Sequence, residues 1–347
     1  MKQFSLMCAL LAYGLSQAFP ALAHGDGTHE DSAQARFETL VALFETADIV
    51  GKPAIVPCTL SGGTKTTCFS ITTVAAPADH TTGPFCPRRI TDTASQAGTW
   101  FKDGEVYDVD GSFIQRLAEI YDDDQWQMYD PETGKVTVAE GTLGCEVAGD
   151  PTSADRYKNY CVECELQNMA AEVTQTYVIP LHPSDASADG EPIGHFSGIG
   201  LALNGAKFDA PAPLDLILGG HTLGPFDDCG GHVNPRSGYH YHGVVGCGPQ
   251  VDADVQDHAP IIGVAMDGYT MHARTDANDQ EPDDLDGCRG HEIEGLGYHY
   301  HVNAPGENQI TGCFKSEIGC TLDDPAGTCD ASNVPERPAR PGRPERH

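Results

Sequence analysis

The sequence predicts a mainly β protein with a few short helices, whose C-terminal domain contains two related, β-rich, disulfide-stapled halves. Three observations support this prediction. Glycine and proline are abundant, with 39 and 24 among 347 residues, which is typical of many turns and short strands. Thirteen cysteines can supply cross-links. One motif rich in histidine and tyrosine occurs twice, as expected for two copies of one structural unit.

Residues 1–23 form a predicted signal peptide. Lys2 provides a positive charge, the apolar run over 4–18 is too short to span a bilayer, and Ala21–Ala23 fits a small-residue cleavage pattern. Cleavage near Ala23 would give a secreted or periplasmic protein, and a retained N-terminal anchor is the alternative. No later segment is long and apolar enough to predict stable membrane insertion.

Residues 24–190 are expected to form an N-terminal mixed α/β region. Apolar residues at helical spacing predict one helix over 34–49 and another over 113–121. A Ser-Gly-Gly turn between Cys58 and Cys68 predicts a hairpin that a disulfide between these two residues would close. Strands are predicted over 100–104 and 174–181.

The composition changes near residue 190, where the chain becomes rich in glycine and histidine. We therefore expect the duplicated domain over residues 191–333. Residues 334–347 alternate proline with arginine and cannot bury a core, which predicts an extended, disordered tail.

The duplicated motif is exact in its spacing. In the first copy, Cys-Gly-Gly-His ends at His232 and Tyr-His-Tyr-His spans 239–242. In the second, Cys-Arg-Gly-His ends at His291 and Tyr-His-Tyr-His spans 298–301, so that matched positions are 59 residues apart. Such agreement indicates two copies of one supersecondary unit.

The histidines of both copies are candidate metal ligands. On a strand, Tyr-His-Tyr-His places its two imidazoles on one face and its two tyrosines on the other. Neutral imidazole is a common ligand of copper and zinc, and the histidine of each Gly-rich turn is a natural third ligand. Histidines hydrogen-bonded in the core, or solvated at the surface, are the alternatives. The two copies would form either one shared metal centre or two neighbouring ones. The predicted ligands are His232, His240, His242, His291, His299 and His301.

Each copy also contains a second cysteine after its histidine motif, at Cys247 and Cys313. Because an oxidising compartment favours disulfides over free thiolates, we expect the pairs Cys229–Cys247 and Cys288–Cys313. The thiolates of Cys229 and Cys288 as metal ligands are the weaker alternative.

Between the copies, an apolar run ends in an Asp-Gly turn at Asp267. This aspartate is the candidate catalytic residue, as a base, a metal ligand or a histidine partner, and an ordinary turn residue is the alternative. Three weaker candidates are copper chelation by an N-terminal His24, a redox or zinc pair in Cys-Val-Glu-Cys at 161–164, and calcium binding by the acidic loops at 108–111 and 276–286. The alternatives are separate disulfide partners for the two cysteines and ordinary acidic turns for the loops.

These residues resemble the YHYH-domain family of exported bacterial and marine proteins. The resemblance covers roughly residues 174–320. It implies export and a duplicated core, and it supplies no reaction. The matching motifs are Leu203-Asn204-Gly205, the run 225–232, both Tyr-His-Tyr-His motifs, Ile261-Ile262-Gly263, Asp267-Gly268 and Gly312-Cys313-Phe314.

The favoured function is the binding of a transition metal, copper or zinc, outside the cytoplasm. The alternatives are a metal-dependent hydrolase or oxidoreductase with an open metal position, and a disulfide-rich structural or adhesion module without metal. The formal net charge of −31 argues against nucleic acid and anionic membranes as partners. The expected partner is the metal ion, and no protein partner is indicated.

Overall fold

The computed structural model describes most of the chain after the predicted signal peptide. The predicted signal peptide, His24 and the Pro/Arg tail lie outside the described residues. The described ranges are 27–141, 158–168, 172–185, 190–193, 198–235 and 237–333.

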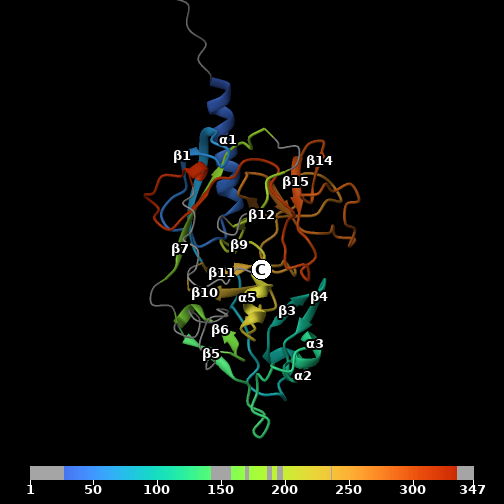
Figure 1. Ribbon diagram of the computed structural model, residues 1–347. Coiled ribbons are helices and arrows are strands. Elements are labelled where there is room, and N and C mark those ends of the chain that lie inside the picture. The colour runs from blue at the N-terminus through green and yellow to red at the C-terminus, as the bar shows by residue number, and fades with distance from the viewer. Residues whose placement is uncertain are drawn as a thin grey trace, which may run out of the picture.

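The largest element is an eight-stranded sheet, which confirms the mainly β prediction. Its strands run diagonally through Figure 1, from β14 and β15 at the upper right to β11 and β10 below the centre. In spatial order they are β10 (Gly231–Asn234), β11 (Gly238–Tyr241), β9 (Lys207–Phe208), β8 (Gly200–Ala202), β12 (Ile261–Ala265), β13 (Thr270–His272), β15 (Gly297–His301) and β14 (Gly290–Ile293).

The strands of this sheet fall into two sets of four, and from the centre outwards each set has the same order along the chain: first, second, fourth, third. We call β8 to β11 the first half and β12 to β15 the second half. The two halves meet where β8 and β12 pair antiparallel, with Leu201 opposite Val264. In each half the first two strands are antiparallel, the second and fourth are parallel, and the third and fourth are antiparallel. This arrangement agrees with the duplication that the sequence predicts.

A second, antiparallel sheet joins the N-terminal region to the end of the chain. Helix α1 (Gly27–Leu43) lies near it at the upper left of Figure 1. Phe44 stacks on Phe69 of this sheet and Phe37 contacts the same ring edge-on. The same core includes Leu201 and Val264 of the large sheet. The strand order is β1 (Ala54–Thr59), β2 (Lys65–Val74), β7 (Thr174–Pro180) and β16 (Cys320–Leu322).

Two predicted helices differ from the structure in their ends. The helix predicted over 34–49 ends at Leu43, because Ile49 already pairs with Thr73 of the sheet. The helix predicted over 113–121 is two short helices that meet at Arg116, whose φ of −100° and ψ of 6° interrupt the helical path.

A third region at the bottom of Figure 1 packs around Trp100, Phe101 and Phe226. Phe226 comes from the segment between β9 and β10, so this region is in direct contact with the first half of the large sheet. Its elements are β3 (Thr99–Lys102), β4 (Glu105–Asp108), α2 (Gly111–Gln115), α3 (Leu117–Tyr121), β5 (Val138–Glu140), β6 (Cys161–Glu163) and α5 (Leu214–Gly219). Short 3-10 helices span Ala94–Gln96, Leu166–Asn168 and Ala331–Asn333.

The described disulfides each lie within one of these regions. The hairpin of β1 and β2 is closed by Cys58–Cys68, and the two halves contain Cys229–Cys247 and Cys288–Cys313, which are the pairings expected from the sequence. Cys161 pairs with Cys86, so that the Cys-Val-Glu-Cys sulfurs do not bond to each other. A further bridge joins Cys320 to Cys329.

The predicted boundary near residue 190 stays a prediction, but backbone pairing crosses it. Strand β16 pairs with β7, and the Tyr239 N–H donates to the carbonyl of Ala75. Among the described residues, no helix is long and apolar enough to cross a membrane.

Candidate metal centres

The strands of the first half bring three histidines together. His232 on β10 lies directly opposite His240 on β11, and His242 follows two residues later on the same face. Their ring centroids are 4.7 to 5.0 Å apart. One nitrogen of each ring lies within 4.8 Å of the others. We call His232, His240 and His242 the first cluster.

The first cluster lies beneath an aromatic cover, with His240 and His242 buried and His232 partly buried. The ring of Phe226 lies 4.9 Å from that of His232 and 5.4 Å from that of His242, and Trp100 stacks on Phe226. His240 is 1% exposed. Burial, followed by the neighbouring imidazoles, lowers the pKa of each of the three histidines to about 3. The rings are therefore neutral at physiological pH.

Backbone carbonyls orient the rings of the first cluster. Nδ1 of His232 donates to the Gly224 carbonyl and Nδ1 of His240 donates to the Gly238 carbonyl, each at 3.1 Å. A neutral imidazole has one N–H, so these bonds leave a lone pair on Nε2 of both rings, and Nε2 of His240 lies 3.4 Å from Nδ2 of Asn234. Nδ1 of His242 is buried without a hydrogen-bond partner. An ion pair between Lys207 and Asp209 lies nearby, at 3.0 Å. Burial alone would raise the pKa of Asp209, but Lys207 and the imidazoles lower it to about 2.

The second half contains a larger group, which we call the second cluster: His258, His291, His299 and His301. His291 on β14 lies directly opposite His299 on β15, as in the first half. The Nε2 atoms of His258 and His291 are each 3.0 Å from Nε2 of His299, and Nε2 of His301 is 3.2 Å from that of His291. These four nitrogens converge on one point.

Every Nδ1 atom of the second cluster has an oxygen partner. His258, His299 and His301 face the carbonyls of Ala259, Gly297 and Ala273 at 2.9 to 3.0 Å. His291 faces the carboxylate of Asp284 at 2.6 Å. In the neutral rings these contacts place the hydrogen on Nδ1 and the lone pair on Nε2.

Lone pairs that face one another at 3 Å repel, because neither nitrogen has a proton to share. Burial lowers the pKa of His301 to about 3 and that of His299 to about 4, so these two rings do not relieve the repulsion by taking up a proton at neutral pH. A cation at the centre would relieve it. Tetrahedral zinc at its usual bond length of about 2.0–2.1 Å sets ligand nitrogens roughly 3.3 Å apart, close to the spacing seen here.

The structure thus groups the six predicted histidines in two separate clusters, three in each half. The alternative of one shared centre does not hold, because β9, β8, β12 and β13 lie between the two Tyr-His-Tyr-His strands. Sequence reasoning missed His258, which lies in a loop without periodic spacing. His272 contacts the ring of His299, but its nitrogens bond to the Ala259 carbonyl and the Thr270 hydroxyl, outside the second cluster.

Asp267, the candidate catalytic residue, lies away from the imidazoles. It accepts hydrogen bonds from the hydroxyl of Tyr300 and the backbone N–H groups of Lys315 and Ser316. Tyr300 projects from the face of β15 opposite His299, so Asp267 contacts the tyrosine face of the sheet. Burial raises its pKa to about 6, and its second oxygen, Oδ1, is buried without a hydrogen-bond partner.

Carboxylates also hold the Gly-rich turns in register. Asp227 accepts from the backbone N–H groups of Cys229 and Gly231 and from the hydroxyl of Tyr239. In the second half, Asp286 accepts from the matching groups at Cys288, Gly290 and Tyr298. The turn that carries each first histidine is thereby fixed to a tyrosine of the neighbouring strand.

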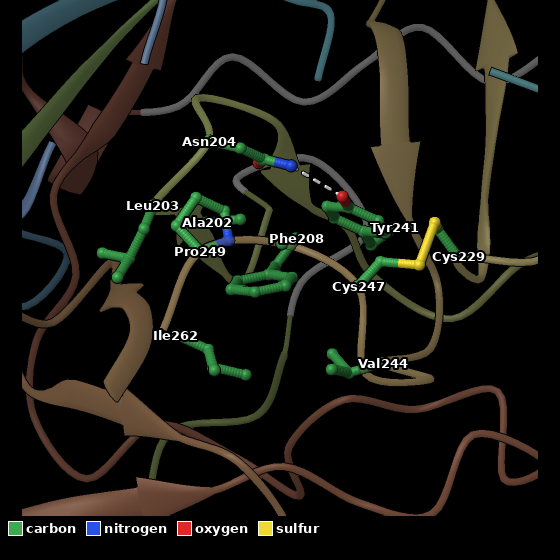
Figure 2. Close-up of a pocket in the computed structure, with 11 residues that line it drawn as sticks. Ala202, Leu203, Asn204, Phe208, Cys229, Tyr241, Val244, Cys247, Pro249 and Ile262 are labelled. Atoms are coloured by element: carbon green, nitrogen blue, oxygen red, sulfur yellow. Dashed lines mark hydrogen bonds between the residues drawn. A yellow bond between two sulfur atoms is a disulfide. The ribbon is translucent and has the colours of Figure 1, made fainter. Parts of the chain in front are cut away.

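Figure 2 shows a hollow on the tyrosine face of the first half. Its wall includes Phe208 and the Cys229–Cys247 disulfide, and Asn204 donates to the Tyr241 hydroxyl at 2.8 Å. The hollow holds about 10 Å³, which is space for one water molecule. It is therefore too small for an organic ligand. Cys229 lies near His80 and Asp227, but its disulfide removes the thiolate that a metal would need.

The acidic loops have local structural roles. Asp110 caps α2 by accepting from the Phe113 N–H at 2.8 Å. Asp276 accepts from the N–H groups of Asn278 and Gln280, also at 2.8 Å. These contacts are typical of aspartates in caps and turns, the alternative that the sequence left open.

The residues around the first cluster carry the similarity of this chain to a known family. Residues 176–283 match the family described as YHYH protein. This stretch is a YHYH-family segment. The YHYH match contains the first cluster, His258 and Asp267, and it ends before β14, so the second Tyr-His-Tyr-His lies beyond it. No curated protein and no solved structure shows a significant match to the chain.

Proposed function

We propose that this protein binds a transition metal, copper or zinc, outside the cytoplasm, with one ion in each histidine cluster. One observation carries the proposal. The four Nδ1 atoms of the second cluster all face oxygen acceptors, which leaves four Nε2 lone pairs directed at one another within a buried space. Only a cation satisfies all four at once.

The main alternative is a set of histidines that simply fill internal hydrogen bonds. That role would need an N–H on one ring aimed at a lone pair on the next. Here His291, His299 and His301 each use their Nδ1 hydrogen elsewhere. Burial lowers the pKa of His299 and His301, which disfavours a second proton on these two rings. A structural module without metal therefore leaves the geometry of the rings unexplained.

Neutral imidazole nitrogens suit copper and zinc, whereas calcium and magnesium prefer oxygen ligands. The carbonyls of Gly297 and Ala273 and the carboxylate of Asp284 hold the rings from behind, as partners of metal-bound histidines commonly do. The first cluster supplies three nitrogens with the same kind of support from Gly224 and Gly238.

The cysteines support the location of the proposed function. Disulfides such as Cys86–Cys161 and Cys320–Cys329 persist in oxidising compartments. In such a compartment the cysteines form disulfides and offer no thiolate to a metal, so that the histidines would be the ligands.

Binding is favoured over catalysis. Four nitrogen ligands complete a tetrahedral zinc site, whereas hydrolytic zinc enzymes keep one position open for water. Asp267, which would serve as the base, lies on the tyrosine face, bonded to Tyr300. A hydrolase or oxidoreductase would need both a vacant position and another proton acceptor.

The test is elemental analysis of protein purified from its native source, followed by titration of metal-free protein with Cu²⁺ and Zn²⁺. We expect two ions per chain. The variants His240→Ala and His299→Ala should each lose one ion, and the double variant should lose both. His221→Ala is the matched control, because His221 pairs with Asp123 outside both clusters. Unchanged affinity in the double variant would refute the proposal.

A further inference from the structure

The two clusters are covered by segments of opposite chemistry. Residues 209–230, between β9 and β10, form the first cover segment, and residues 273–289, between β13 and β14, form the second. Each segment contacts its own cluster: the Gly224 carbonyl accepts from His232, and the carboxylate of Asp284 accepts from His291. The two segments occupy matching positions in the two halves, so that differences in their polarity and burial would affect how easily a metal ion reaches each cluster.

The first cover segment is apolar and continuous with a hydrophobic core. Leu223 is fully buried and Phe226 is 1% exposed. Phe226 stacks on Phe101 at 4.5 Å while contacting two rings of the first cluster. His232 is partly exposed, as His258 is, but neither of the two described cavities is lined by the rings of the first cluster. We therefore expect an ion in this cluster to leave through opening of that core.

The second cover segment is acidic and partly open. A cavity of about 170 Å³ is lined by His258 and His301 of the second cluster, and by Asp257, Asp276 and Glu281. His258 is only partly buried, in contrast to His299 and His301, which are fully buried. The cavity therefore connects the second cluster to solvent.

The charges at this cavity favour a cation. Glu281 bonds to both Arg274 and Arg289, so that these three side chains together carry one positive charge. Among the described residues, Asp257 and Asp276 make no ion pair, and their two negative charges make the wall beside the imidazoles negative by one charge overall. Such a wall attracts metal ions and repels anionic substrates.

From these features we infer that the second cluster is an exchange site, where the ion enters and leaves through the acidic cavity, whereas the first cluster retains its ion. The inference rests on the proposed function and adds a division of labour to it. His258 is the ligand at the cavity, and its partial exposure makes it the first ligand to release the ion.

The test follows the release of zinc from fully loaded protein to a chromogenic chelator. We expect two phases, with one ion per phase, separated by at least about tenfold in rate because the first cluster needs its apolar cover to open. The variant His258→Ala should lose the fast phase and keep the slow one. The variant His240→Ala should lose the slow phase and keep the fast one.

The outcomes separate the two ideas. Protein that takes up no zinc at the loading step would refute the proposed function. Protein that takes up two ions and releases them in one phase, or that keeps its fast phase in His258→Ala, would overturn the inference alone. Since His240→Ala alters a buried residue, the wild-type time course and His258→Ala decide the matter if that variant does not fold.

The charge argument has its own measurement. The double variant Asp257→Asn with Asp276→Asn should slow zinc uptake at low salt severalfold, and added salt should remove the difference. Asparagine keeps the oxygen that accepts the backbone bonds of Asp276. The matched control is Glu45→Gln with Asp48→Asn, two exposed carboxylates in another region. Equal uptake by the two double variants would refute cation steering at the cavity.

Discussion

Asn204 and Asp267 occupy matching places in the two halves, and the difference between them is one charge. Each follows the innermost strand of its half, and each bonds to a tyrosine hydroxyl of Tyr-His-Tyr-His, Tyr241 or Tyr300. Asn204 is neutral and bonds through its amide, whereas Asp267 holds a buried carboxyl with one unpaired oxygen. The second half therefore carries an electrostatic cost that the first half lacks.

Asp267→Asn should remove a pH-dependent part of the stability. The pKa of Asp267 is raised from 3.8 to about 6 in the folded protein, so the native state holds the proton more tightly than the unfolded state does. Stability from this group is full below pH 3.8 and is lost as pH rises through 6, a loss of roughly 3 kcal/mol. Between pH 4 and pH 7 the variant should gain that much relative to wild type, measured by urea unfolding.

The control for this experiment is Asp252→Asn, which neutralises an exposed carboxyl. It should leave the difference from wild type nearly constant across the same pH range. If the difference in unfolding free energy between Asp267→Asn and wild type is also independent of pH, the Asp267 carboxyl is ionised in the folded protein as easily as in the unfolded chain.

At the scale of elements, the turn that joins Cys288 to β14 has little spare room. A Cβ atom on Gly290 would lie 2.1 Å from the Tyr298 hydroxyl, which is anchored on Asp286. Gly290→Ala should therefore displace the tyrosine and shift His291, with a loss of about 1–3 kcal/mol in stability, as overpacking usually costs. Zinc titration should show weaker binding at the second cluster only.

Gly287→Ala is the matched control in the same turn, since a Cβ atom there meets nothing within 4 Å. Its stability and zinc binding should equal those of the wild type. If Gly290→Ala also binds two ions with unchanged affinity, the turn does not position the ligands as we describe.

Sequence periodicity predicted the ligands that lie on strands and missed the one on a loop. His240 and His242 alternate with tyrosines, and alternation alone assigns them to one face. His258 follows no repeat, and only tertiary folding brings it within 3.0 Å of His299. Asp267 was a candidate for the metal site, with an ordinary turn residue as the alternative, and its place between the copies could not decide on which face of the sheet its side chain lies.

At the scale of the whole molecule, the matching halves and the pairs Cys229–Cys247 and Cys288–Cys313 could be predicted from the fixed spacing of the motifs. The pairs Cys86–Cys161 and Cys320–Cys329 follow no such spacing and were not predicted. The strand order could not be predicted either, because pairing of β12 with β8 joins segments more than fifty residues apart. That order separates the two clusters and excludes the shared centre. The helix ends were missed for a related reason, since pairing of Ile49 with Thr73 overrides local helical spacing.

The described regions should unfold as one unit. Strand β16 completes the sheet formed by β1, β2 and β7, and a single core joins Phe69 to Val264. We expect residues 24–333 to show one cooperative thermal transition, followed by circular dichroism and calorimetry. Residues 191–333 alone should not fold, because they would expose that core and leave β16 without its partner.

Two separate transitions in the longer chain would contradict this expectation. So would a cooperative transition in the shorter one, which would instead support an independent domain beginning near residue 191. Disulfides must stay oxidised in both samples, because reduction would add a second cause of instability.

The outermost strands of the large sheet, β10 and β14, each carry one cluster histidine directly opposite another on the neighbouring strand. A bound ion would thus clip each border strand to the strand inside it. Unprotected borders of sheets invite pairing with other chains. Without the metal, β10 and β14 would be held less firmly, and their detachment would leave β11 and β15 as unpaired edges. Self-association of the metal-free protein would begin at these two edges.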